Sequence, residues 1–167
     1  IGDWSSDVCS SDLPSLDYVI AKLPRFPFDK FASASNELGT QMKATGEVMG
    51  IGANLEEALL KGIRSLESGE NHIYHPKFND MTVDEMLAYI SKFRSDNIFA
   101  IAELFYHGVS VEKIYELTQI TPYFLNAIKN IVDMEETLKL HVDDPQWLKK
   151  AKVMGFSDKY IARLWKQ

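Results

Sequence analysis

Two histidines and a nearby aspartate are the residues whose spacing most resembles that of metal ligands. His72 and His75 lie three residues apart, and Asp80 follows in the same segment, SGENHIYHPKFND (residues 68–80). A zinc ion needs three or four ligands held by ordered structure, whereas this segment has the composition of a polar linker. We therefore predict a solvated loop here and no metal site.

Glu47 is the carboxylate with the strongest claim to a function. It lies among glycines in a stretch that is otherwise apolar, GEVMGIG (residues 46–52). An ionised carboxylate is costly in an apolar setting unless it is paired. An ordinary ion pair with an upstream arginine is the alternative interpretation of this residue.

The remaining ionisable residues show no partner arranged for general acid–base chemistry, so we predict no catalytic residue. His107 and His141 are isolated and are expected to interact with the last carbonyl groups of their helices. The acidic residues are expected on solvated helix faces or at caps, and the lysines at a helix end. These residues are Asp133, Glu135, Glu136, Asp143, Asp144, Lys149, Lys150 and Lys152.

A strand followed by a helix must position Glu47. Gly46 and Gly50 lie within the expected strand, residues 43–51, and Gly52 follows it directly. Three glycines so close together indicate a close approach to another backbone, a ligand or a channel wall, or else a bulged strand edge. Asn54, with Glu57 three residues later, predicts the start of an amphipathic helix. Its apolar stripe is Leu55, Ala58, Leu59, Gly62, Ile63 and Leu66.

An earlier strand is expected within Pro14–Phe31, where apolar residues such as Tyr18 and Ile20 alternate with Val19 and Ala21, so that both faces are apolar. Pro24 and Pro27 end this strand, because proline cannot donate to a ladder. Two strands and one helix cannot cover both faces of a sheet. We therefore predict an incomplete α+β piece whose partner strands lie upstream.

The chain after residue 67 is helical by pattern, so the fold class is an α+β piece followed by an all-α domain. Six N-terminal cap signals open the expected helices, and Gly108 and Gly155 end two of them. The caps are Thr82, Asp96, Ser110, Thr121 before Pro122, Asp144 before Pro145, and Ser157. The expected inward residues include Phe93 and Leu117. The last helical pattern is still running at Gln167, as in a cut fragment.

Residues 110–131 have the outline of a helix-turn-helix, with two helices around a four-residue turn. A DNA-reading helix pair needs a basic face for the phosphates. Here Glu112 and Glu116 cancel Lys113 and Lys129, and the segment has no arginine. We predict no nucleic-acid binding.

The first thirteen residues, IGDWSSDVCSSDL, have no usable period and resemble a translated sequencing adapter, with a disordered acidic leader as the alternative. They hold the only cysteine, Cys9, and three of the charges in the net charge of −6, so residues 14–167 carry −3. Without cysteine, no disulfide framework is expected, which fits a cytosolic protein. The mild charge and the lack of a long apolar run give no reason to expect a membrane partner.

Several stretches together resemble the large subunit of carbamoyl phosphate synthetase. They are PSLDYVIAKLPRFPFDKF (residues 14–31), QMKATGEVMGIG (41–52), EEALLKGIRSLE (56–67) and, more loosely, GVSVEKIYELTQITPYFLNAIKNIVDME (108–135). The resemblance implies that residues 14–67 close the carboxyphosphate ATP-grasp domain. It also implies that residues 68–167 form a truncated helical oligomerisation domain.

For the parent protein, the resemblance implies a ligase that uses two ATP and Mg²⁺ or Mn²⁺. It makes carbamoyl phosphate from bicarbonate and from ammonia that a glutaminase small subunit releases, for arginine or pyrimidine synthesis. The resemblance places Glu47 along a tunnel for unstable intermediates. No nucleotide-binding or metal-binding residue of the family has a counterpart here, so we expect this polypeptide alone to be inactive. A free-standing helical interaction module is the alternative.

Overall fold

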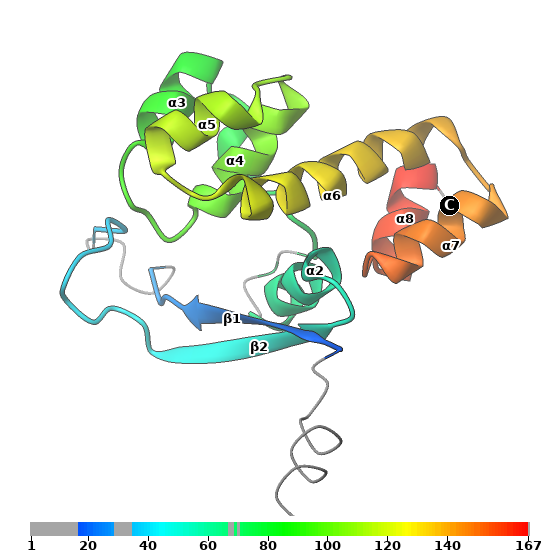
Figure 1. Cartoon of the computed structure of the whole chain (residues 1–167), viewed down its shortest axis with the longest axis horizontal. Coiled ribbons are helices and arrows are strands. Elements are labelled where there is room, and N and C mark those ends of the chain that lie inside the picture. Colours follow the sequence, from blue (N-terminus) through cyan, green and yellow to red (C-terminus); the bar gives the residue numbers. More distant parts are fainter. Residues whose placement is uncertain (1–16, 29–34, 67–68, 70, 167) are drawn as a thin grey trace, which may run out of the picture.

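The computed structural model describes residues 17–28, 35–66, 69 and 71–166. The strands in these ranges are β1 (Val19–Arg25) and β2 (Gly46–Gly52), followed by helix α2 (Leu55–Ser65) and a short 3-10 helix, η1 (Pro76–Phe78). Six further helices follow in the described part of the chain: α3 (Val83–Ile90), α4 (Asn97–Tyr106), α5 (Val111–Thr118), α6 (Pro122–Leu140), α7 (Pro145–Val153) and α8 (Asp158–Trp165). The predicted class, an α+β piece and then a helical part, is confirmed (Figure 1). The expected leader, residues 1–13, lies outside the described residues.

The two strands pair antiparallel, with Ile20 opposite Ile51, and α2 covers one face of this hairpin. The glycines explain how closely the helix approaches. A Cβ on Gly50 would overlap the carbonyl oxygen of Ala58 and lie 2.5 Å from the amide nitrogen of Gly62. Of the interpretations left open by the sequence, a close approach of one backbone to another is therefore the one observed at Gly50.

Local signals begin most of the helices. Thr82 and Glu85 form a full capping box, and the side chains of Ser110, Asp144 and Ser157 accept hydrogen bonds from backbone amides of the first turn. Asp96 and Thr121 also stand before helices but make no such bond. Gly108 and Gly155 have φ values of +76° and +89°, as helix-ending glycines often do.

Helix α6 is the central helix of the helical part, because it contacts α2, α4, α5, α7 and α8 (Figure 1). The core around it includes Leu60 and Ile63 of α2, so the same core spans the β-containing and the helical parts. The predicted stripe of α2 was wrong in one respect, because Leu60 is fully buried and Leu59 is only partly so.

Two further sequence predictions were wrong. Phe93 is 72% exposed because α3 ends at Ile90, before the helical period can bring Phe93 inward. Leu117 is on the solvent side of α5, and Thr118 is buried there instead, with its hydroxyl bonded to the Ile114 carbonyl.

Candidate functional site

Glu47 lies on the face of the hairpin that α2 does not cover. Its Oε2 atom lies 2.7 Å from Nζ of Lys22 on β1, and both side chains are more than half exposed. An ion pair this exposed contributes little to stability. Glu47 thus pairs with a lysine of the neighbouring strand and not with the arginine of the alternative interpretation, while its role in a tunnel stays a prediction.

Apolar side chains surround this ion pair on the uncovered face. Four large apolar residues there are each about half exposed or more: Tyr18, Ile20, Met49 and Ile51. Ile20 and Ile51 are direct cross-strand neighbours, so the patch is continuous across the hairpin. A two-stranded sheet with an apolar open face has no independent stability, which agrees with the expectation that further structure covers it.

A second group of polar residues lies inside the helical part, where the sequence predicted solvent. His72 is 2% exposed and Glu135 is 4% exposed. The hydroxyl groups of Tyr106 and Tyr160 both donate to Oε2 of Glu135, the latter over 2.8 Å, and Lys139 lies 2.9 Å from Oε1. The prediction of a solvated loop at His72 and of a solvated face at Glu135 was therefore wrong.

His72 packs as an aromatic ring in this cluster. It stacks on Tyr160 with ring centroids 3.9 Å apart and also touches Phe156. Its Nε2 atom lies 3.2 Å from Oε2 of Glu135. Neither ring nitrogen makes a well-directed hydrogen bond with any described residue. The histidine thus fills the core beside the carboxylate.

The surroundings of Glu135 keep it ionised. Burial alone would raise the pKa of Glu135, but the close His72 ring, the Tyr106 hydroxyl and Lys139 outweigh burial and lower the pKa to about 2. Burial lowers the pKa of His72, so its imidazole is neutral near pH 7. Burial and the negative charge of Glu135 raise the pKa of both tyrosines. The cluster therefore stabilises a buried charge.

The two other residues whose spacing resembles that of metal ligands, His75 and Asp80, lie apart from this cluster. Nδ1 of His75 accepts a hydrogen bond from the backbone amide of Lys77 and caps η1, and Asp80 is exposed. Within the described ranges, no three His, Cys, Asp or Glu side chains are grouped so that they could hold a metal ion. The same part of the chain contains no helix long and apolar enough to cross a membrane.

The isolated histidines and the lysine cluster have their own partners. Nε2 of His107 lies 3.6 Å from Oε1 of Glu103, and His141 stacks on Trp147. Lys150 lies over the ring of Trp147, while Lys152 donates to the carbonyl of Phe156 just beyond α7. The prediction for the lysines, a position at the end of a helix, agrees with this arrangement.

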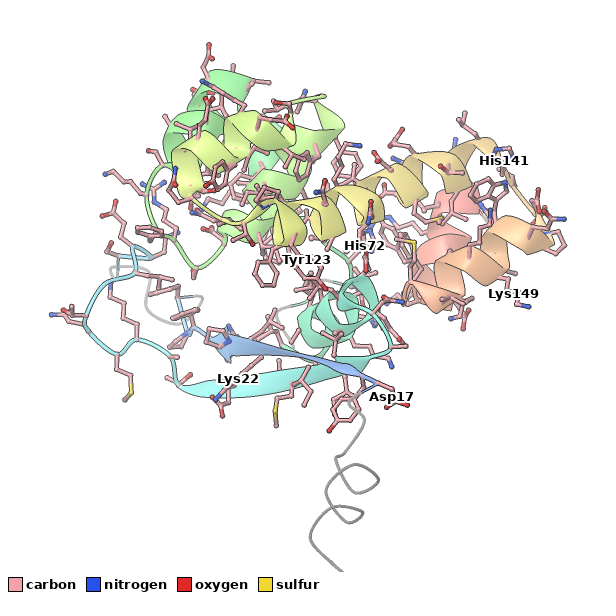
Figure 2. The ribbon with its side chains drawn as sticks, in the orientation of Figure 1. Asp17, Lys22, His72, Tyr123, His141 and Lys149 are labelled. Atoms are coloured by element: carbon pink, nitrogen blue, oxygen red, sulfur yellow. The ribbon has the colours of Figure 1, made fainter. Side chains whose placement is uncertain are left out.

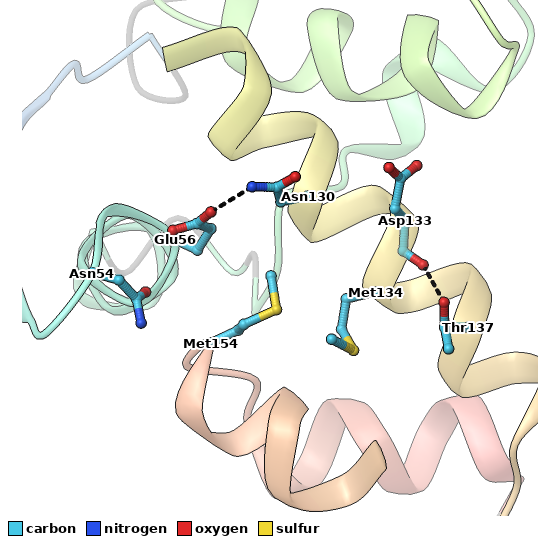
Figure 3. A pocket seen from close by; sticks show the side chains of 7 residues that line it. All are labelled: Asn54, Glu56, Asn130, Asp133, Met134, Thr137 and Met154. Carbon is cyan, nitrogen blue, oxygen red and sulfur yellow. Dashed lines mark hydrogen bonds between the residues drawn. The ribbon is translucent and has the colours of Figure 1, made fainter. Parts of the chain in front are cut away.

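A groove of about 400 Å³ lies where α2, α6 and α7 meet, shown in Figure 3. Nδ2 of Asn130 donates to Oε1 of Glu56 over 2.8 Å, and Asn54 donates to the carbonyl of Val153. Nearby, Nη1 of Arg64 donates to the carbonyl of Gly155 over 2.7 Å. These bonds join α2 to the helical part at several points.

A second junction holds the loop before β2 against the helices. The backbone amide of Leu38 donates to the carbonyl of Phe93, and Glu37 forms an isolated β-bridge with Arg94. Asn36 also donates to Oδ1 of Asp96, which explains why the Asp96 carboxylate does not cap α4. The hairpin, α2 and the helices are therefore fixed to one another at both ends of the hairpin.

Together, a hairpin with one uncovered face and a helical core built around a structural carboxylate define a helical domain attached to a small α+β piece. The family model for the carbamoyl-phosphate synthetase large chain, oligomerisation domain, matches residues 47–167. The chain belongs to this family. Its helical part is thus of a kind that occurs in the large chain of a ligase and associates with other chains.

The buried Glu135 cluster is the feature that the sequence analysis missed. One signal for it was present: Glu135 continues the apolar stripe of α6 that contains Ile128, Ile131 and Val132. A carboxylate on a buried stripe must find donors elsewhere in the fold, and those donors are distant in sequence.

Proposed function

We propose that this chain is part of the large subunit of a glutamine-dependent carbamoyl phosphate synthetase. That enzyme activates bicarbonate with one ATP, combines it with ammonia released by a glutaminase subunit, and phosphorylates the resulting carbamate with a second ATP. The family match over residues 47–167 is the observation that carries this proposal. The proposal includes a cytoplasmic location and a place in arginine or pyrimidine synthesis.

Within that enzyme, the described residues would serve as a junction and an assembly element. The uncovered apolar face of the hairpin supports a position at the end of a larger sheet, which further chain upstream would supply. Helix α2 then connects that sheet to the helical part, which would associate with other large subunits. The hydrogen bonds at the two junctions support a fixed connection between these parts.

The chain by itself would bind no nucleotide. Phosphoryl transfer needs metal ions and basic side chains around the phosphates, and the described residues do not fit such a group because they offer no metal-ligand cluster. Isothermal titration of the chain with ATP and Mg²⁺ should give no saturable heat. Stoichiometric binding would overturn this part of the proposal.

Glu47 is proposed to line the route of an intermediate in the full enzyme. Its exposed position on the uncovered face supports contact with upstream structure. In the complete enzyme, Glu47→Ala should uncouple carbamoyl phosphate formation from ATP hydrolysis while both partial ATPase reactions remain. Lys22→Ala is the matched control, because it removes only the ion-pair partner. Unchanged coupling in Glu47→Ala would refute the role.

A further inference from the structure

Two adjoining hollows lie along α8. Three residues line both of them: Tyr74, Tyr160 and Arg163. The first hollow, of about 290 Å³, also reaches His72, and the second, of about 510 Å³, also reaches Lys139 on α6. We call the two together the α8 hollow. Its size is that of a site for a small molecule.

The α8 hollow is positively charged. Its second part is lined by three cations, Lys139, Arg163 and Lys166, and by one carboxylate, Glu135, which leaves a net charge of +2 in a chain of −6. Glu135 is already bonded to Lys139 and to two tyrosine hydroxyl groups. Arg163 and Lys166 are exposed and form no ion pair with a carboxylate of the described ranges. Since a guanidinium group binds carboxylate or phosphate through two parallel N–H bonds, the charge favours a small oxyanion.

His72 gives the hollow a buried polar group without a partner. Its side chain is 2% exposed, and neither ring nitrogen makes a directed hydrogen bond with a described residue. Burial lowers the pKa of His72, so the neutral ring has one N–H donor and one free lone pair. Figure 2 shows His72 in the interior of the molecule, close to α6. Buried polar groups nearly always have a partner, and a hydroxyl group on a ligand would be one.

Tyr74 gives the hollow a hydrogen-bond donor. Its hydroxyl oxygen accepts a hydrogen bond from Nδ2 of Asn79 over 2.6 Å, so its own proton is left for another acceptor. The hydroxyl proton of Tyr160, by contrast, is already donated to Glu135. The groups that can bind an oxyanion are therefore the guanidinium of Arg163 and the hydroxyl of Tyr74.

We propose that the α8 hollow binds a small oxyanion that also carries a hydroxyl group, either a hydrogen phosphate or a hydroxy acid. Arg163 and Tyr74 hold the charged oxygens, and the hydroxyl group of the ligand donates to the free ring nitrogen of His72. The positive charge at Lys166 attracts the anion to a chain that is otherwise negative. This site goes beyond the proposed function, which stands whether or not the hollow binds an anion. The titration with ATP is a separate test, because Mg²⁺ neutralises the phosphates of ATP.

Isothermal titration of the whole chain at constant ionic strength tests the proposal with two pairs of anions. Phosphate is compared with sulfate, and malate with succinate. The members of each pair have similar size and charge at pH 7.5, but only phosphate and malate carry a hydroxyl donor. We expect saturable binding of phosphate, malate or both, each more tightly than its partner anion. Binding of phosphate alone identifies a phosphate site, and binding of malate alone identifies a hydroxy-acid site.

Three variants locate the anion. Arg163→Gln should raise the Kd at least about tenfold, because a charged hydrogen-bond donor is lost. Lys149→Gln is the matched control: it removes the same charge from α7 (Figure 2), outside the α8 hollow, and should leave the Kd unchanged. His72→Phe keeps an aromatic ring beside Tyr160 but removes both nitrogens, so it should abolish the preference for phosphate over sulfate or for malate over succinate. Circular dichroism establishes that each variant keeps its helices.

Three results would overturn the proposal. If none of the four anions binds saturably, the hollow is not an anion site. If Arg163→Gln and Lys149→Gln weaken binding equally, the anion only screens the surface charge. If the wild-type chain binds both members of each pair equally, the contact between the ligand hydroxyl and His72 is wrong, and this comparison holds even where His72→Phe does not fold.

Discussion

Gly50→Ala should destabilise the protein strongly, because β2 and α2 meet there without side chains between them. The new Cβ would overlap the carbonyl oxygen of Ala58 and lie 2.5 Å from the amide nitrogen of Gly62. Both obstacles are backbone atoms of α2, so no rotamer change can make room. The helix must move away from the strand, and with it Leu60 and Ile63 in the main core.

The size of the effect follows from overpacking. Forcing an extra methyl group into a well-packed contact costs about 1–3 kcal/mol, and we expect the upper end because backbone must yield. A loss of about 3 kcal/mol is a large part of the usual stability of a domain. At this chain length it should lower Tm by about 6–12 °C.

Gly46→Ala is the matched control, in the same strand and with the same change of residue. A Cβ on Gly46 would meet no atom of the described residues within 4 Å. Removing glycine from the unfolded chain favours folding by up to about 1 kcal/mol where the native backbone accepts alanine, so Tm should stay the same or rise slightly. Thermal and urea unfolding followed by circular dichroism compare the two. Equal stability of Gly50→Ala and Gly46→Ala would refute the close packing of β2 on α2.

Three further predictions concern the helical part. Glu135→Gln should lower the free energy of unfolding by about 2–4 kcal/mol in urea titrations, because buried donors lose a charged acceptor; Glu136→Gln, on the solvent side, should change it little. The pKa of Glu135 is about 2 in the folded chain, against an ordinary value of 4.5. Its contribution to the free energy of unfolding should therefore be complete above pH 4.5 and should fall by about 3 kcal/mol as the pH drops toward 2. A wild-type stability that varies with pH as little as that of Glu135→Gln would contradict this. Gly155→Ala should lower the free energy of unfolding by about 1–3 kcal/mol in the same assay, because φ is +89° and the new Cβ would lie 2.8 Å from Cα of Glu57. Gly69→Ala is the control: φ is the same, but a Cβ there would meet no described atom within 4 Å, so this variant measures the backbone strain alone.

Local signals in the sequence were sufficient to predict most helix starts. The capping box of Thr82 and Glu85, and the prolines at 122 and 145, act within a single turn, so their effect is independent of the rest of the fold. The end of α3 carries no equally strong signal, and the prediction for Phe93 failed for that reason.

Predictions that needed tertiary contacts were less complete. A single stripe was predicted for α2, but this helix is buried on two sides: Ala58 and Gly62 face the hairpin, while Leu60 and Ile63 join the helical core. A helix between two layers has no single apolar face to find.

The Glu135 cluster was missed for a related reason. The residues that surround its carboxylate come from four separate segments, and His72 lies 63 positions away from it in the chain (135 − 72). Glu135 itself lies on the buried stripe of α6, but the histidine and the two tyrosines that contact it lie on other segments. Only the folded chain brings the hydroxyl groups, the lysine and the imidazole to one carboxylate.

The bare contact between β2 and α2 also has a mechanical consequence. Side chains at an ordinary interface can change rotamer and so accommodate a small displacement. Two backbones in direct contact have no side-chain rotamers between them that could do this. A displacement of the strand at Gly50 is therefore expected to move α2, and the core that α2 shares with α6 would move with it. We therefore expect β2 and α2 to move as one rigid unit, one side of which is buried in the core of the helical part.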